Sequence, residues 1–171
     1  RVVVIPARCR AAEEHRLVAP VSDPDFWRKR RADRRGEVVC GLLRRGPGGD
    51  RMVMTRMADY PAGVFRVPSG GIGHGETAID ALWREVAEEL GVPFRIVAYA
   101  GKVDFVFAAA GADLTLPSYC FLIDQIGDQD VEPAVDCDGE VAAWRGASIE
   151  QVIEHAAALA RLPGAWADWG Q

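Results

Sequence analysis

The stretch from residue 70 to residue 92 reads Gly70-Gly71-Ile72-Gly73-His74-Gly75-Glu76-Thr77-Ala78-Ile79-Asp80-Ala81-Leu82-Trp83-Arg84-Glu85-Val86-Ala87-Glu88-Glu89-Leu90-Gly91-Val92. Its first part is rich in glycine, which favours a loop, and its second part has the apolar periodicity of a helix. Thr77 can cap that helix, Asp80 favours its positive end, and Gly91 suits a left-handed C-terminal cap. The stretch therefore predicts a loop that leads into a helix over about residues 77–90.

The predicted helix has two faces with different chemistry. At about 100° per residue, one face gathers glutamates and small residues, namely Ala78, Ala81, Glu85, Glu88 and Glu89. A neighbouring arc is apolar and would pack against a sheet; it holds Ile79, Leu82, Trp83, Val86 and Leu90. We expect one face to join the core and the acidic face to stay sterically open.

Three glutamates within one helical turn repel one another by a few tenths of a kcal/mol per solvated pair. A divalent cation would remove this repulsion, and carboxylate oxygens with incomplete protein coordination suit Mg²⁺ or Mn²⁺. A solvated acidic helix face is the simpler interpretation of the glutamates alone. It does not account for the attached glycine-rich loop.

The spacing of the stretch is distinctive. Gly70 is followed after five residues by Glu76 and after seven more by Arg84-Glu85-Val86; one residue then separates this run from Glu88-Glu89, and one more precedes Gly91-Val92. This pattern resembles the complete signature of the Nudix hydrolases, with no departure at its fixed positions. This signature, the Nudix box, covers residues 70–92, and the segment that precedes and overlaps it, residues 65–71, also looks like the family.

The resemblance implies roles for individual residues. Carboxylates at the positions of Glu85 and Glu89 bind the catalytic metal, Mg²⁺ or Mn²⁺ as its substitute, and the one at Glu88 often joins them. The carbonyl before the signature, here that of Ser69, also ligates metal, although many members have glycine there. The remaining positions are structural: Glu76 and Arg84 pair to brace the loop against the helix, and Gly70 and Gly91 shape the backbone.

The resemblance also implies a reaction, the hydrolysis of the pyrophosphate bond in a nucleoside diphosphate linked to another group. Nucleoside triphosphates, ADP-ribose and other nucleotide sugars, dinucleoside polyphosphates and dinucleotide cofactors all remain open as substrates. The general base would be Glu85 or Glu140, and Glu132, Asp136 and Asp138 compete with Glu140. The alternative is a non-hydrolytic Nudix domain that acts as a nucleotide sensor or interaction module. Such domains commonly lose the box glutamates, whereas this chain keeps them.

The composition fits a single globular domain of 171 residues, about half of them apolar, with a formal net charge of −5. No stretch is apolar enough to span a membrane, nothing reads as a secretory signal, and the four cysteines lack paired zinc spacing, so we expect a cytoplasmic location.

Residues 28–35 are strongly basic. A basic run of this kind can form a nucleic-acid or phosphate patch, but a solvated helix or linker is the commoner case and is our interpretation. The overall acidity argues against a dedicated nucleic-acid binder. Phe26 and Trp27 are expected to anchor this segment rather than stack on bases.

The remaining pattern predicts a mixed sheet with helices. Strands are expected at residues 2–5, 38–43, 52–55, 64–68, 95–109, 114–126 and 140–145, and Ser148 with Gln151 predicts a capping box that begins a helix ending near Arg161. Pro117 indicates an edge or a bulge in its strand. The resemblance implies an α/β/α sandwich, with residues 1–35 as an N-terminal extension and residues 36–171 as the Nudix domain. It leaves a homodimer open.

Overall fold

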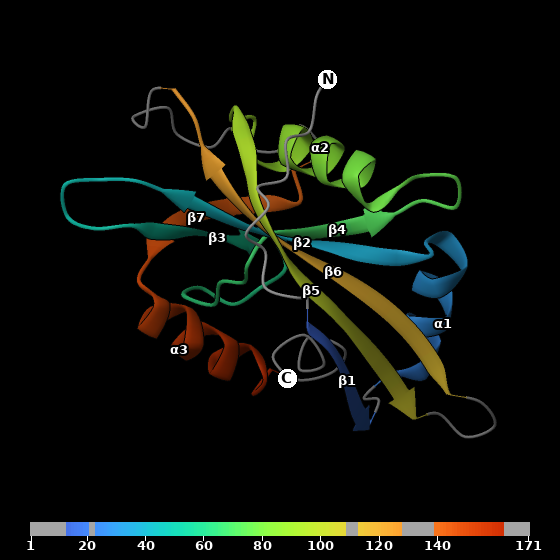
Figure 1. Cartoon of the computed structure of the whole chain (residues 1–171). Helices are drawn as coiled ribbons and strands as arrows, with labels where there is room; N and C mark the ends of the chain where they lie inside the picture. Colours follow the sequence, from blue (N-terminus) through green and yellow to red (C-terminus); the bar gives the residue numbers. More distant parts are fainter. Residues whose placement is uncertain (1–12, 21–22, 109–112, 128–138, 163–171) are drawn as a thin grey trace.

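The computed structural model describes residues 13–20, 23–108, 113–127 and 139–162 (Figure 1). The strands that it contains are β1 (Glu13–Pro20), β2 (Gly36–Arg44), β3 (Arg51–Met57), β4 (Ser69–Ile72), β5 (Phe94–Ala108), β6 (Leu114–Gln125) and β7 (Val141–Ala147). The helices are α1 (Pro24–Asp33), α2 (Ala78–Glu89) and α3 (Ile149–Leu159).

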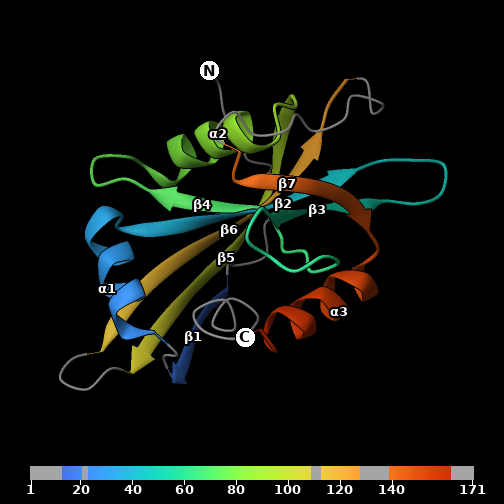
Figure 2. The ribbon, with the colours of Figure 1, turned by 180° about the vertical axis from the view of Figure 1, so that it is seen from behind.

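The strands form one mixed sheet in the order β1-β5-β6-β2-β3-β7, with β4 paired to β2 beside this path. The pairs β1/β5 and β2/β6 are parallel, and the other pairs are antiparallel. Helix α2 covers one face of the sheet, whereas α1 and α3 lie on the opposite side (Figures 1 and 2). This confirms the predicted α/β/α sandwich with a mixed sheet.

Helix α2 has the caps and the apolar stripe that its sequence predicts. The Thr77 side chain accepts a hydrogen bond from the Asp80 amide, and Gly91 has φ of +61° directly after the helix. Leu82, Val86 and Leu90 are buried in the same cluster as the β2 residues Val38, Cys40 and Leu42. Each such side chain contributes about 1.5–3 kcal/mol through burial, so packing against β2 fixes the position of the helix.

The beginning of the glycine-rich stretch differs from the prediction. Residues 69–72 form strand β4 against β2, whereas the expected strand at residues 64–68 is reduced to a single bridge between Thr55 and Arg66. Glycine composition alone favours a loop, but here the missing side chains let neighbouring groups approach the strand. A Cβ on Gly71 would lie 2.6 Å from Cζ of Arg34. Tertiary contacts therefore override the local preference.

The strands on either side of the box largely follow the prediction. The hairpin β2/β3 and the long pair β5/β6 are both present. Strand β6 lies inside the sheet, so Pro117 is not on an edge strand, and the register shifts of this pair fall in β5 rather than at Pro117. The ladder between β2 and β6 begins only at the Glu37/Ser118 pair. Pro117 precedes this ladder, so its missing amide removes no hydrogen bond to β2.

The two other helices are also capped at their N-termini, and the cap of α3 is the one that the sequence predicts. The capping box between Ser148 and Gln151 begins α3, and Asp23 caps α1 by accepting from the amides of Asp25 and Phe26. Trp27 is 2% exposed and stacks on Phe107 with ring centroids 4.2 Å apart, which confirms its anchoring role. The basic segment is therefore a helix packed on the sheet.

Several predicted features lie outside the described residues. They are the strand at residues 2–5, Cys9 and Cys137, and the acidic residues Glu132, Asp136 and Asp138. Cys40 and Cys120 are free thiols. Within the described ranges, no helix is both long and apolar enough to cross a membrane.

Candidate active site

The Glu76 and Arg84 side chains, which the resemblance pairs, meet in a two-point ion pair. Arg84 Nε and Nη2 each donate to one Glu76 carboxylate oxygen at 2.9 Å, and Nη2 also donates to the Gly71 carbonyl at 2.7 Å. The Gly73 amide donates to Glu76 at 3.0 Å. The hydrogen bond from Arg84 is the main reason that the pKa of Glu76 lies below its ordinary value. This network joins β4, the following loop and α2.

The carboxylate of Glu85 lies against the backbone of Gly70. A Cβ atom built on Gly70 would overlap this carboxylate, so only glycine leaves room for it. The Glu85 side chain is 13% exposed and accepts a hydrogen bond from Arg84 Nη1 at 2.7 Å. Burial raises the pKa of Glu85, and the contact with Arg84 opposes that shift. The helix thus presents one nearly enclosed carboxylate to the start of the box.

The acidic face of α2 is less open than its sequence predicts. Glu89 is only 8% exposed and Ala81 is completely buried, whereas the Glu88 side chain is 47% exposed and bonds to Arg84 Nη1 at 3.0 Å. The reason is the position of the helix over β2 and β4, which encloses the side of the acidic face nearest the sheet. The simple interpretation of a solvated acidic face is therefore wrong for Glu85 and Glu89.

The Ser69 carbonyl lies beside a cationic side chain. Both terminal nitrogens of Arg66 are 3.3 Å from this oxygen, and Nη1 also donates to the Ser69 hydroxyl. Ser69 directly precedes Gly70, against which the Glu85 carboxylate packs. The Ser69 carbonyl and the Glu85 carboxylate are therefore associated with neighbouring residues at the start of β4.

These oxygens fit a hard divalent cation. Among the described residues, no three His, Cys, Asp or Glu side chains converge as a metal site, so the carboxylates do not form a complete cage. Mg²⁺ is usually held by one or two carboxylates, with water and substrate phosphates completing the shell. Glu85, Glu89 and the Ser69 carbonyl supply oxygens of that kind, and Glu88 lies at the exposed end of the set.

A buried charge cluster beside the box has no counterpart in the sequence interpretation. Glu37 on β2 has a side chain 1% exposed, with Arg34 Nη1 3.3 Å and Arg30 Nε 3.7 Å from its Oε1 atom. Burial raises the pKa of Glu37, and Arg30 and Arg34 oppose that shift. The only available signal was an acidic residue at the start of an otherwise apolar strand, at residues 36–43.

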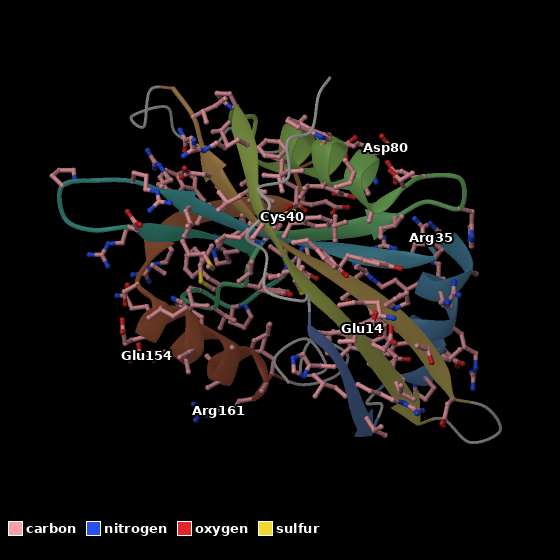
Figure 3. The ribbon with its side chains drawn as sticks, viewed as in Figure 1. Glu14, Arg35, Cys40, Asp80, Glu154 and Arg161 are labelled. Carbon is pink, nitrogen blue, oxygen red and sulfur yellow. The ribbon has the colours of Figure 1, made fainter. Side chains whose placement is uncertain are left out.

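The basic segment at residues 28–35 is therefore solvated only in part. Arg28 and Lys29 are exposed, but Arg30 and Arg34 point toward Glu37. Arg35 donates through Nε and Nη2 to the Glu76 carbonyl at 2.9 and 2.6 Å, and in Figure 3 it lies between α1 and the box loop. The predicted helix is confirmed. The predicted solvation is wrong for Arg30 and Arg34, because β2 supplies the buried carboxylate of Glu37 as their counter-charge.

Glu140, the second candidate base, is exposed just before β7. It lines a polar cavity of about 360 Å³ together with Arg30, Tyr60 and Arg66. Its backbone carbonyl accepts from the Ala58 amide at 2.8 Å, which fixes the position of the chain there.

His74, predicted to contact solvent or substrate, is exposed. Its Nε2 lies 2.8 Å from the Ala32 carbonyl, so His74 links the box loop to α1.

Comparison with known proteins agrees with this geometry. A family model for the NUDIX domain matches residues 34–168. The NAD-capped RNA hydrolase NudC of Mycobacterium tuberculosis is 32% identical over 99 residues, which cover 57% of this chain and 29% of NudC. The chain therefore matches less than a third of the length of this relative.

Solved structures share the fold. A NUDIX family protein from Listeria monocytogenes superposes with a TM-score of 0.56 at 18% identity, covering 70% of this chain and 81% of that one. The Nudix hydrolase RenU from Mycobacterium smegmatis gives a TM-score of 0.54 at 20% identity, covering 78% and 80% of the two chains. Since the family model matches most of the chain, and the complete box lies within the match, this chain belongs to the NUDIX domain family.

Proposed function

We propose that this chain is a Mg²⁺-dependent pyrophosphohydrolase that cleaves the diphosphate of a nucleoside diphosphate linked to another group. The observation that carries the proposal is the enclosure of Glu85 and Glu89 on one face of α2, with the Glu85 carboxylate packed against Gly70. Carboxylate oxygens in incomplete protein coordination suit a divalent ion, and a diphosphate with water would complete its shell.

The residues that would hold Mg²⁺, or Mn²⁺ in its place, are Glu85, Glu89 and the Ser69 carbonyl, with Glu88 at the edge. When bound, the cation supplies positive charge to the diphosphate and makes water more acidic. Arg66 lies beside Ser69 and also lines the polar cavity with Arg30. Their guanidinium groups suit phosphate oxygens, so they would bind and orient the diphosphate.

Two carboxylates are candidates to accept the proton of the attacking water. Glu85, itself a proposed metal ligand, is nearly enclosed, and burial raises its pKa. Glu140 lines the polar cavity together with Arg30 and Arg66. We keep both as candidates, and Glu140→Gln separates them, because Glu85→Gln would lose kcat as a metal ligand in either case. A loss of kcat in Glu140→Gln identifies Glu140 as the base, whereas a raised KM with unchanged kcat leaves Glu85.

The substrate class follows from the family and its relatives. We propose a small nucleoside diphosphate derivative of the nucleoside triphosphate, ADP-ribose or dinucleotide type, and the similarity to the NAD-capped RNA hydrolase NudC supports the dinucleotide type. The formal net charge of −5 and the inward-facing Arg30 and Arg34 argue against a dedicated nucleic-acid partner. The division into an extension at residues 1–35 and a catalytic domain from residue 36 stays a prediction.

The direct test is product release from ADP-ribose, nucleoside triphosphates, dinucleoside polyphosphates and dinucleotide cofactors, each with Mg²⁺, Mn²⁺ or a chelator. We expect turnover of at least one compound with either cation and none with the chelator. Binding of a compound without turnover under any of these conditions would contradict hydrolysis and support the nucleotide-sensor alternative.

A further inference from the structure

The box loop, residues 73–76, connects the end of β4 to the N-cap of α2. Arg35 holds both ends of this loop. Its backbone amide donates to the Ile72 carbonyl at 2.9 Å, and its side chain donates through Nε and Nη2 to the Glu76 carbonyl at 2.9 and 2.6 Å. In Figure 3 the Arg35 side chain lies between α1 and this loop. One residue outside the Nudix box therefore fixes the distance across the loop.

Two further contacts join the C-terminal end of α1 to the same segment. The Nε2 atom of His74, in the middle of the loop, lies 2.8 Å from the carbonyl of Ala32 in the last turn of α1. A carbonyl only accepts, so Nε2 is the donor. Arg34 packs against Gly71, where an added Cβ would lie 2.6 Å from Cζ of the arginine. The end of α1 and the two residues after it therefore contact the box along residues 71–76.

The loop held in this way leads to the metal-binding carboxylates. Arg84 Nε and Nη2 donate to the Glu76 carboxylate at 2.9 Å, and Arg84 Nη1 donates to the Glu85 carboxylate at 2.7 Å. Arg84 is thus a shared partner of both glutamates. A shift of the Glu76 backbone would move the guanidinium that orients Glu85. Contacts therefore run without interruption from Arg35 through Glu76 and Arg84 to Glu85.

These contacts come from a part of the chain without an assigned role in the chemistry. The family model begins at residue 34, directly after α1, and the first fixed position of the box is Gly70. The proposed reaction uses Arg30 of α1 but leaves the C-terminal end of this helix and Arg35 unassigned. Trp27, 2% exposed, attaches α1 to the sheet, so the loop is tied to an element that is itself well anchored.

We propose that Arg35 is a positioning residue for the hydrolysis: it ties the box loop to the end of α1 and thereby holds Arg84 and Glu85 in place. The inference rests on the proposed function, because it concerns the same site. A misplacement of about 1 Å can cost 10²-fold in rate, and since Arg35 acts through two other residues, we expect its loss to lower kcat by about tenfold. Arg35 does not line the polar cavity, so KM should change by less than about twofold.

The first test is steady-state kinetics with Mg²⁺ on a compound that the wild type hydrolyses. Arg35→Met keeps an aliphatic side chain without a donor and should lose about tenfold in kcat, whereas Arg35→Lys keeps a donor for the Glu76 carbonyl and should stay within about threefold of the wild type. Arg28→Met is the matched control, because Arg28 belongs to the same basic segment and pairs with the exposed Asp25. It should retain wild-type kcat.

The second test needs no turnover. In the metal-free protein, the Gly73 amide donates to the Glu76 carboxylate and the Glu76 amide donates to the Gly73 carbonyl. Hydrogen exchange followed by NMR should show both amides exchanging at least about fivefold faster in Arg35→Met, and at the wild-type rate in Arg28→Met. Calorimetric titration with MnCl₂ should show binding about threefold weaker in Arg35→Met, because Glu85 is less well placed.

Wild-type exchange of both loop amides in Arg35→Met would overturn the proposal. So would wild-type kcat in the folded variant with only a lower denaturation midpoint, since that result shows a contribution to stability alone. If the wild type hydrolyses none of the compounds, the proposed reaction fails, and the second test still decides the role of Arg35. Faster exchange with weaker Mn²⁺ binding in Arg35→Met would support it. Unchanged exchange, unchanged Mn²⁺ affinity or no Mn²⁺ binding by the wild type would contradict it.

Discussion

The position of the Glu85 carboxylate depends on a side chain that is missing. Gly70 has a negative φ, so glycine is required there for space and not for backbone conformation. Because the carboxylate packs directly on this residue, the start of β4 and the middle of α2 are fitted to each other. The glycine therefore helps to position Glu85 without carrying a functional group.

Replacing Gly70 by alanine should displace the Glu85 carboxylate, because the new Cβ would occupy its place. A misplacement of about 1 Å can cost 10²-fold in rate, so we expect kcat to fall by about that factor. Gly75→Ala is the matched control, since no atom lies within 4 Å of a Cβ added there. Steady-state kinetics with equal losses in both variants would show that the contact with Glu85 does not matter.

Glu76 makes a stability contribution that depends on pH. Its pKa is lowered in the folded protein, chiefly by the hydrogen bonds from Arg84, so the contribution is present above the ordinary pKa of a glutamate and is lost as the pH falls through the lowered value. At pH 7, Glu76→Gln should reduce the free energy of unfolding by about 1.5–3 kcal/mol. Denaturant titrations should show this difference shrinking below pH 4. A difference of the same size at pH 3 and pH 7 would refute the assignment.

At the scale of elements, α1 acts as a support for the site. Trp27 holds the helix on β5 and β6 through Phe107 and Leu116, and the same helix brings Arg30 to the buried Glu37. Glu37 faces α1 because it alternates with the apolar residues Val38 and Cys40, which face α2. One strand thus presents core residues to one helix and a counter-charge to another.

Removing the Trp27 side chain should therefore loosen α1. Trp27→Ala should lower the free energy of unfolding by about 3–5 kcal/mol, as large-to-small changes at buried aromatic residues do. Lys29→Ala, on the exposed side of the same helix, should change it by less than about 0.5 kcal/mol. Chemical denaturation of both variants measures the difference. A loss below 1 kcal/mol for Trp27→Ala would contradict the anchoring role.

At the scale of the whole molecule, the sequence predicts features whose causes are local. The caps at Thr77 and Ser148, the apolar stripe of α2 and the β2/β3 hairpin are encoded by neighbouring residues, and all are present. The box spacing also predicts the Glu76/Arg84 contact, through its resemblance to a family.

The features that could not be predicted depend on pairings distant in sequence. Strand β4 forms despite its glycines because it pairs with β2. Strand β1 joins the sheet by parallel pairing with β5, which lies far from it in the sequence. The inward direction of Arg30 and Arg34 depends on Glu37, whose burial follows from the packing of α1 on the sheet. Nothing in the local pattern of residues 28–35 reveals this counter-charge.

The central claim is that the enclosed carboxylates of α2 hold the cation needed for hydrolysis. Its most direct test is the turnover of the Glu89→Gln variant with Mg²⁺, since this change keeps the shape of a side chain that is 8% exposed and removes its charge. The matched control is Glu154→Gln, on the outer side of α3 (Figure 3). Circular dichroism first establishes that both variants are folded. We then predict that Glu89→Gln loses at least about 10²-fold in kcat, as expected for the loss of a strong electrostatic contribution to the transition state. Glu154→Gln should retain wild-type turnover. Wild-type turnover by folded Glu89→Gln would contradict the claim.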